Sequence, residues 1–161
     1  MARHSEITIS LRWSDLDELG HVNHVASLGL LAEMRRRWFR AFAKIEPAEF
    51  VIARLEVEFL DELTLADDPL HLELRVANLG RRSVQTEERI LSASKTAKLD
   101  TRTTLVLWNA ATRSPRELTN AEREALKHGQ VEGVRTVRSG APARPNSPRS
   151  RRRSDDGGLR R

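Results

Sequence analysis

Residues 12–24 read RWSDLDELGHVNH and join two segments of different periodicity. Before them, apolar and polar residues alternate from Ile7 to Trp13, which predicts a half-buried strand. After them, apolar residues recur at helical spacing to about Ala43, which predicts a long helix with one buried face. The stretch therefore places aspartates, a glycine, histidines and an asparagine where a strand gives way to a helix N-terminus.

Asp15 and Asp17 are the acids of this stretch, and an acid beside a helix N-terminus can do chemistry. Its carboxylate can attack a carbonyl carbon or activate water, while the first free N–H groups of the helix stabilise a developing oxyanion. The plainer interpretation is that each aspartate hydrogen-bonds backbone N–H groups of the loop or helix. From composition and spacing alone, this structural interpretation is the favoured one for both residues.

Gly20, His21, Asn23 and His24 complete the chemically useful positions of the loop. Gly20 permits a positive φ or a close approach of a ligand, and Asn23 is a good helix N-cap. His21 can orient the acid or move a proton at neutral pH, although a loop histidine bonded to backbone is an equal alternative. His21 and His24 could join Asp17 in a metal site, but no further ligand is evident, so no metal is expected.

The long helix is expected to bury one stripe and to leave its other side in solvent. The stripe steps through Leu28, Leu31, Met34 or Arg35, Trp38 and Phe42. The arginines mostly fall off it, and Glu33 is expected to pair with Arg36 or Arg37 on the surface.

The residues after this helix predict a sheet and a short second helix. Apolar and polar residues alternate again in four segments, at 51–59, 70–76, 84–91 and 99–108. Consecutive strands without intervening helices indicate an antiparallel sheet, so we expect an α+β domain in which about five strands wrap around one long helix. A capping box, Thr119 with Glu122, starts a helix over 121–127 that Gly129 would end.

Residues 130–161 differ from the rest of the chain in composition and charge. They hold nine arginines against three carboxylates, a net charge of +6, so residues 1–129 carry −1 of the total of +5. Because the basic balance belongs to this tail, it gives no reason to assign nucleic-acid binding to the domain. The tail has almost no apolar residues, so we expect a folded domain over 1–129 and a disordered Arg/Pro/Ser-rich tail over 130–161.

Composition also excludes several classes of protein. The chain has no cysteine, and therefore no disulfide or thiolate metal site. It has no run of 18 apolar residues that could cross a membrane, and its first residues lack the apolar segment of a signal peptide. We therefore expect a cytoplasmic protein with no membrane-spanning helix.

The motif and the order of elements together resemble a known family. Residues 13–23, WSDLDELGHVN, resemble the D-x-D-x-x-G-H-V-N signature of the 4-hydroxybenzoyl-CoA thioesterase family of acyl-CoA thioesterases, which have the hotdog fold. The resemblance extends from about Ile7 to Leu126. It implies a hydrolase of thioesters of coenzyme A or acyl carrier protein that needs no metal or redox cofactor. It also implies a homodimer or a dimer of dimers, with active sites at the subunit interface.

The resemblance assigns roles to the residues of the loop. Asp17 matches the catalytic carboxylate, which acts as nucleophile or general base. Gly20 and His21 match the part of the loop that turns into the helix. The backbone N–H groups near Asn23 and His24 match the oxyanion donors.

A second matching stretch is LGRRS at 79–83, where the family often has a similar Gly/Arg/Ser sequence. Arg81, Arg82 and Ser83 match the region that helps to hold the nucleotide end of coenzyme A, and guanidinium groups bind phosphates through charge-assisted hydrogen bonds. An ordinary basic turn is an equal alternative for these residues.

The chain also differs from the family at several positions. Ser27 replaces an aromatic residue, Ala32 replaces a glutamate with Glu33 one position later, and the aromatic-x-x-Pro pattern after the helix reads FLDEL at 59–63. These differences keep open a non-catalytic hotdog protein that binds acyl thioesters or is structural. The arginine tail keeps open a nucleic-acid-associated protein.

Overall fold

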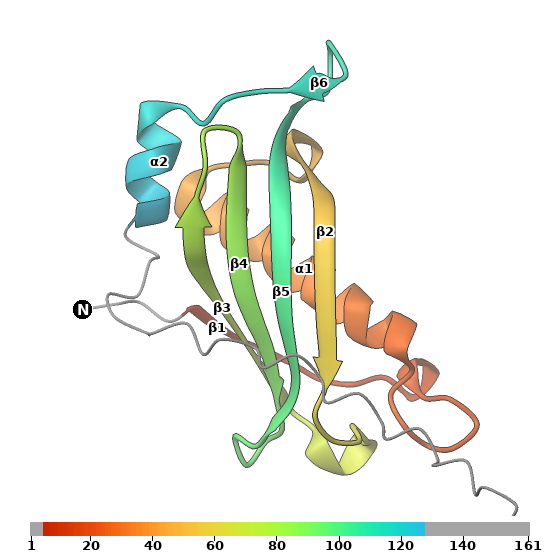
Figure 1. The fold of residues 1–161 in the computed structure, drawn as a ribbon. Coiled ribbons are helices and arrows are strands. Elements are labelled where there is room, and N and C mark those ends of the chain that lie inside the picture. Colours follow the sequence, from red (N-terminus) through yellow and green to blue (C-terminus); the bar gives the residue numbers. More distant parts are fainter. Residues whose placement is uncertain (1–4, 128–161) are drawn as a thin grey trace, which may run out of the picture.

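The computed structural model describes residues 5–127, with the elements drawn in Figure 1. The helices are α1 (His24–Ala43) and α2 (Asn120–Lys127). The strands are β1 (Ser5–Ile9), β2 (Phe50–Phe59), β3 (Leu70–Leu79), β4 (Ser83–Leu91), β5 (Ala97–Asn109) and β6 (Ser114–Pro115). The sequence-based tail over 130–161 lies outside the described residues and stays a prediction.

The strands form one antiparallel sheet in the order β1-β3-β4-β5-β2, and the short β6 pairs with the end of β5. Helix α1 crosses one face of this sheet, and α2 packs near α1 and β3 (Figure 1). This is the predicted α+β architecture, a curled antiparallel sheet with one long helix, so the hotdog fold is confirmed.

Helix α1 begins and ends at residues that explain its bounds. Asn23 is the N-cap, and its side-chain oxygen accepts a hydrogen bond from the Val25 N–H at 2.8 Å, as the sequence predicted. Lys44 ends the helix in the left-handed conformation with a φ of 56°. Between them the helix buries Leu31, Met34, Trp38 and Phe39 against the sheet.

Two details of the predicted first strand and helix stripe were wrong. Strand β1 ends at Ile9, and Trp13 is 80% exposed in a short 3-10 turn. The turn forms because the Asp15 carboxylate accepts the Arg12 N–H at 2.8 Å, which bends the chain away from the sheet. Phe42 is 40% exposed, and its neighbour Phe39 packs into the core in its place.

An ion pair crosses the core between α1 and the sheet. The Arg35 Nε atom lies 2.9 Å from a carboxylate oxygen of Glu88 in β4, and both side chains are almost fully buried. The same carboxylate accepts hydrogen bonds from three threonine hydroxyls, those of Thr86, Thr101 and Thr103. Glu33 instead pairs with Arg36 and Arg37 at the surface, as predicted.

Strand β2 is the edge of the sheet beside β5 and is the least covered strand. It hydrogen-bonds only to β5 within residues 5–127, so one side of its backbone is unpaired. Several of its apolar side chains, and one just after it, are exposed: Val51, Ile52, Phe59 and Leu60. An edge strand with this composition is a surface on which another strand can pair.

Candidate active site

The loop before α1 holds Asp17 through its own backbone. One carboxylate oxygen, Oδ1, accepts the N–H groups of Leu19 at 2.9 Å and His21 at 3.1 Å, and the Asp17 N–H donates to the His21 carbonyl at 2.8 Å. The second oxygen, Oδ2, makes no hydrogen bond with any residue in the range 5–127, and the side chain is exposed. Gly20 adopts the positive φ that the sequence predicted, 80°. The loop therefore fixes one oxygen of the acid and leaves the other free to react.

The start of α1 offers donors that are not used by the fold. The Asn23 N–H is occupied, because it donates to the Asp15 carbonyl at 2.8 Å, and the Val25 N–H is occupied by the Asn23 cap. The N–H groups of His24 and Ala26 have no acceptor among the described residues. Free N–H groups in the first turn of a helix bind oxyanions.

Asp15 has the structural role that was favoured for it. Its side chain is 4% exposed and pairs with the Arg12 guanidinium at 3.0 Å. Burial acts to raise the pKa of the Asp15 carboxyl, but the hydrogen bonds from the Arg12 side chain and backbone outweigh burial and lower the pKa. The chain thus separates its two neighbouring aspartates into one that shapes the loop and one that faces solvent.

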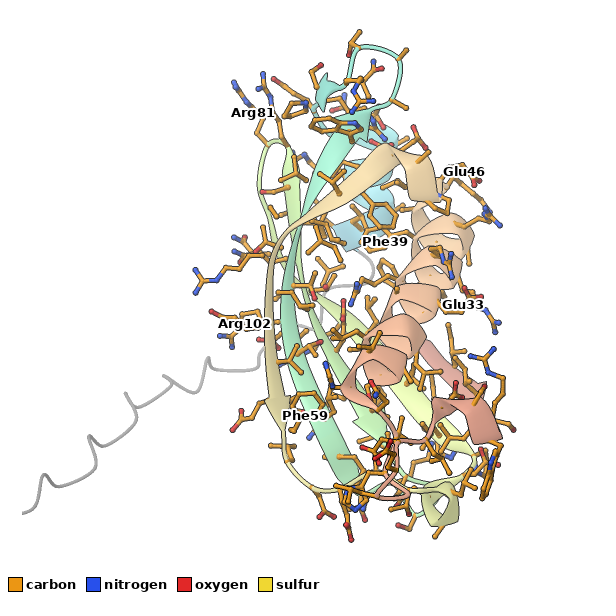
Figure 2. The ribbon with its side chains drawn as sticks, turned by 90° about the vertical axis from the view of Figure 1, so that its right-hand side faces the viewer. Glu33, Phe39, Glu46, Phe59, Arg81 and Arg102 are labelled. Atoms are coloured by element: carbon orange, nitrogen blue, oxygen red, sulfur yellow. The ribbon has the colours of Figure 1, made fainter. Side chains whose placement is uncertain are left out.

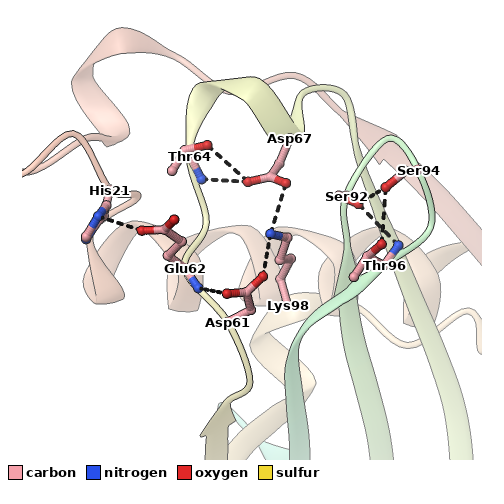
Figure 3. Close-up of polar contacts among 9 residues, drawn as sticks. All are labelled: His21, Asp61, Glu62, Thr64, Asp67, Ser92, Ser94, Thr96 and Lys98. Carbon is pink, nitrogen blue, oxygen red and sulfur yellow. Dashed lines mark hydrogen bonds and ion pairs between the residues drawn. The ribbon is translucent and has the colours of Figure 1, made fainter.

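His21 is paired with a residue that the sequence did not single out. Its Nε2 atom lies 3.0 Å from a carboxylate oxygen of Glu62, in the segment that follows β2 (Figure 3). The same segment pairs with the loop backbone: the Val22 N–H donates to the Leu63 carbonyl at 2.6 Å, and His21 forms a β-bridge with Thr64. The sequence did contain a signal for Glu62. In FLDEL at 59–63, Glu62 stands where the family that the chain resembles often has proline.

Lys98 of β5 fixes this segment from the other side. Its ammonium group lies 2.8 Å from Asp61 and 3.2 Å from Asp67, and Asp67 in turn accepts hydrogen bonds from the backbone and hydroxyl of Thr64 (Figure 3). The hydrogen bond with Asp61 is the largest cause of the raised pKa of Lys98, and it also lowers the pKa of Asp61. The segment that carries Glu62 is therefore anchored to the sheet.

Arg81, Arg82 and Ser83 lie far from this loop. They occupy the turn between β3 and β4 and the start of β4, at the end of the sheet opposite to the loop (Figures 1 and 2). Both guanidinium groups are exposed and approach Glu117, at 3.3 Å and 3.7 Å. A single chain thus brings together Asp17, Gly20, His21, Asn23 and His24, and keeps the basic turn apart from them.

No group of three or more His, Cys, Asp or Glu side chains is placed to hold a metal ion within the described part of the chain. Neither of the helices between residues 5 and 127 is long and apolar enough to cross a membrane.

Comparison with known proteins assigns the class. Residues 11–128 match the model of the Thioesterase-like superfamily, and the chain belongs to this superfamily. No curated protein matches the chain at a significant level.

Solved structures of thioesterases share the fold. A thioesterase from Thermus thermophilus, complexed with coenzyme A and Zn, is 29% identical with a TM-score of 0.69, over 76% of this chain and 90% of that one. A putative acyl-CoA thioesterase from Xanthomonas campestris is 29% identical with a TM-score of 0.58, over 65% and 93%. A DHNA-CoA thioesterase from Staphylococcus aureus, 16% identical with a TM-score of 0.66 over 77% and 89%, shares the fold.

Proposed function

We propose that the protein hydrolyses an acyl thioester, with acyl-CoA as the substrate class and Asp17 as the reacting acid. The observation that carries the proposal is the free Oδ2 of Asp17 in a loop that leads directly into a helix start with unused N–H groups. The superfamily and the thioesterases of similar structure support the same reaction.

In the proposed reaction the thioester carbonyl oxygen lies against the His24 and Ala26 N–H groups, which stabilise the negative charge that develops on it. Asp17 Oδ2 either attacks the carbonyl carbon or removes a proton from the water that attacks it. The C–S bond breaks, and the sulfur leaves as thiolate and takes up a proton. Water supplies the new oxygen, either directly to the product acid or to Asp17 after a carboxylate oxygen of Asp17 has left with the product. The attacking-acid route passes through a mixed anhydride that a water molecule then hydrolyses.

The test is a turnover assay of the purified full-length protein with aliphatic and aromatic acyl-CoAs, in which the free thiol is measured. Release of thiol well above the rate without protein supports the proposal. A protein that binds acyl-CoA in calorimetry and releases no thiol across the panel would instead be a non-catalytic binding protein, and the proposal would be wrong. Label in the Asp17 carboxylate after one turnover in ¹⁸O-labelled water identifies the attacking-acid route with the anhydride opened at the aspartyl carbon. Trapping of the acyl group on the protein by hydroxylamine identifies the same route when water opens the anhydride at the acyl carbon.

We further propose that the working unit is a homodimer joined through β2. The acid and the basic turn lie at opposite ends of one protomer, so a single chain does not offer both to one coenzyme A molecule. Pairing of two β2 edges would satisfy the free backbone side of this strand and cover its exposed apolar residues.

Placing a charge on the exposed edge tests this dimer. Ile52 is 47% exposed in β2, so Ile52→Glu should fold normally but put a carboxylate into an apolar interface. We expect a dimer dissociation constant at least about tenfold higher, measured by light scattering during size-exclusion chromatography over a dilution series. Glu73→Gln on the middle of the sheet serves as a control, and equal dissociation of both variants would contradict the β2 interface.

The basic turn is expected to act on binding and not on chemistry. If Arg81 and Arg82 hold phosphates of coenzyme A, the double variant Arg81→Ala/Arg82→Ala should raise KM for acyl-CoA about 10- to 100-fold, because charge-assisted hydrogen bonds are lost. The kcat should change little. The same acyl group on pantetheine, which lacks the nucleotide, should show no increase in KM, and an equal increase for both substrates would contradict the assignment.

A further inference from the structure

We propose that Glu62 is a positioning residue for the reaction, acting through the imidazole of His21. The inference rests on the thioester hydrolysis proposed above and adds a residue from a separate part of the chain. Glu62 lies 41 positions beyond His21, and the two side chains meet only because the segment after β2 folds back onto the loop before α1 (Figure 3).

The contact between Glu62 and His21 is part of a continuous set of bonds that ends at Asp17. The carboxylate of Glu62 binds Nε2 of the ring, at 3.0 Å. The backbone of the same histidine donates its N–H to Asp17 Oδ1 and accepts the N–H of Asp17 on its carbonyl. The same histidine thus binds the proposed acid through its backbone and Glu62 through its ring.

The pair also determines which ring nitrogen is available. A carboxylate that accepts a hydrogen bond from Nε2 keeps the proton on that nitrogen and so leaves Nδ1 for other partners. The side chain of His21 is 40% exposed, so the ring is open to water. In hydrolysis one proton must leave the attacking water and one must reach the departing sulfur, and an oriented imidazole can serve as the carrier.

Both partners are attached to rigid elements, which makes this pair different from an ordinary surface ion pair. Leu63 and Thr64 bind the loop backbone, and Lys98 holds Asp61 and Asp67 on either side of Glu62. The backbone N–H of Glu62 itself donates to the Asp61 carboxylate at 2.9 Å. Because the backbone on both sides is already fixed, less conformational entropy opposes the pair than would oppose two free side chains.

The experiment compares Glu62→Gln, Glu62→Ala and His21→Ala in the full-length protein. Glutamine keeps an acceptor for Nε2–H, so we expect kcat to fall only a few-fold, whereas Glu62→Ala should lower it on the order of 10- to 100-fold with KM little changed. His21→Ala should lower kcat at least as much, and adding Glu62→Ala to it should cause no further loss. The melting temperatures should stay within about 3 °C of the parent, because Glu62 is exposed and His21 is only half-buried.

Glu6→Ala is the matched control, because Glu6 is another surface carboxylate that pairs with a histidine, His71, away from the loop. It should keep the parent kcat. Long-range ¹H–¹⁵N spectra provide a readout that does not depend on turnover: the His21 ring should be in the Nε2–H form in the parent and in Glu62→Gln, and a mixture of tautomers in Glu62→Ala.

The outcomes separate the two proposals. If the parent protein turns over acyl-CoA and the Glu62→Ala variant does so equally fast, the proposed role of Glu62 is wrong. The proposed function is then unaffected. A falling kcat with an unchanged His21 tautomer would also overturn it, since the effect would not pass through the ring. A parent without turnover removes the proposed function, and the positioning role with it.

Discussion

Asp17→Asn should lower kcat for thioester hydrolysis by about 10²- to 10⁴-fold, the range expected when a general base is lost, and by more if the acid is the nucleophile. The asparagine side chain has the same shape, and its oxygen can still accept the Leu19 and His21 N–H groups that now bind Oδ1. The loop should therefore stay in place and the melting temperature should not fall. The measurements are kcat and KM with the best substrate of the acyl-CoA panel, together with thermal unfolding.

Asp15→Asn is the matched control for that experiment. Asp15 is two positions away, but it is buried and its carboxylate is paired with Arg12. Losing this pair should reduce stability and leave kcat within a few-fold of the parent. If Asp17→Asn keeps full activity while Asp15→Asn abolishes it, the roles that we give to the two aspartates are reversed.

Breaking the buried pair between α1 and β4 should cause the largest loss of stability. Glu88→Leu leaves the Arg35 guanidinium in the core without its anion, and removing one partner of a buried ion pair costs about 3–5 kcal/mol. We expect the free energy of unfolding in urea to fall by this amount, with a melting temperature roughly 10 to 20 °C lower. Glu33→Ala removes the surface pairs with Arg36 and Arg37 and should cost less than about 1 kcal/mol.

The double variant Arg35→Met/Glu88→Leu completes the test. Replacing both charges by apolar side chains removes the unpaired ion, so most of the lost stability should return. The three threonine hydroxyls that now bind Glu88 would then lack this acceptor, which limits the recovery. The single variant Arg35→Met is measured beside it, and a double variant that loses the sum of the Arg35→Met and Glu88→Leu losses would show that the pair itself contributes nothing.

The sequence was sufficient for features that depend on neighbouring residues. The Asn23 cap, the positive φ of Gly20 and the bounds of α1 follow from local chemistry, and so does the capping box of Thr119 and Glu122, which forms with hydrogen bonds at 2.8 Å and 3.2 Å. The loop that carries Asp17 could be located for the same reason.

The features that the sequence did not reveal depend on contacts between distant segments. Helical spacing offered Arg35 only as an alternative to Met34 in the buried stripe, although both are buried, and a residue among other arginines is more simply placed in solvent. Glu88 had a usable signal, since it shares a face of β4 with Val84, Thr86 and Ile90, but a charged residue in a charged strand is more simply placed in solvent. The contact of His21 with Glu62 likewise needs the fold, because only the return of the chain after β2 brings them together.

Strand β2 links the proposed subunit interface to the segment that holds His21. It ends at Phe59, three residues before Glu62, and the chain between them is tied by the backbone of Leu60 and Asp61 to Lys98. The edge of the sheet and the segment that supports the His21 loop are therefore joined by a stretch of chain that is itself hydrogen-bonded to β5. A second strand added to that edge would damp motion in the loop directly, so activity should depend on protein concentration in step with subunit association.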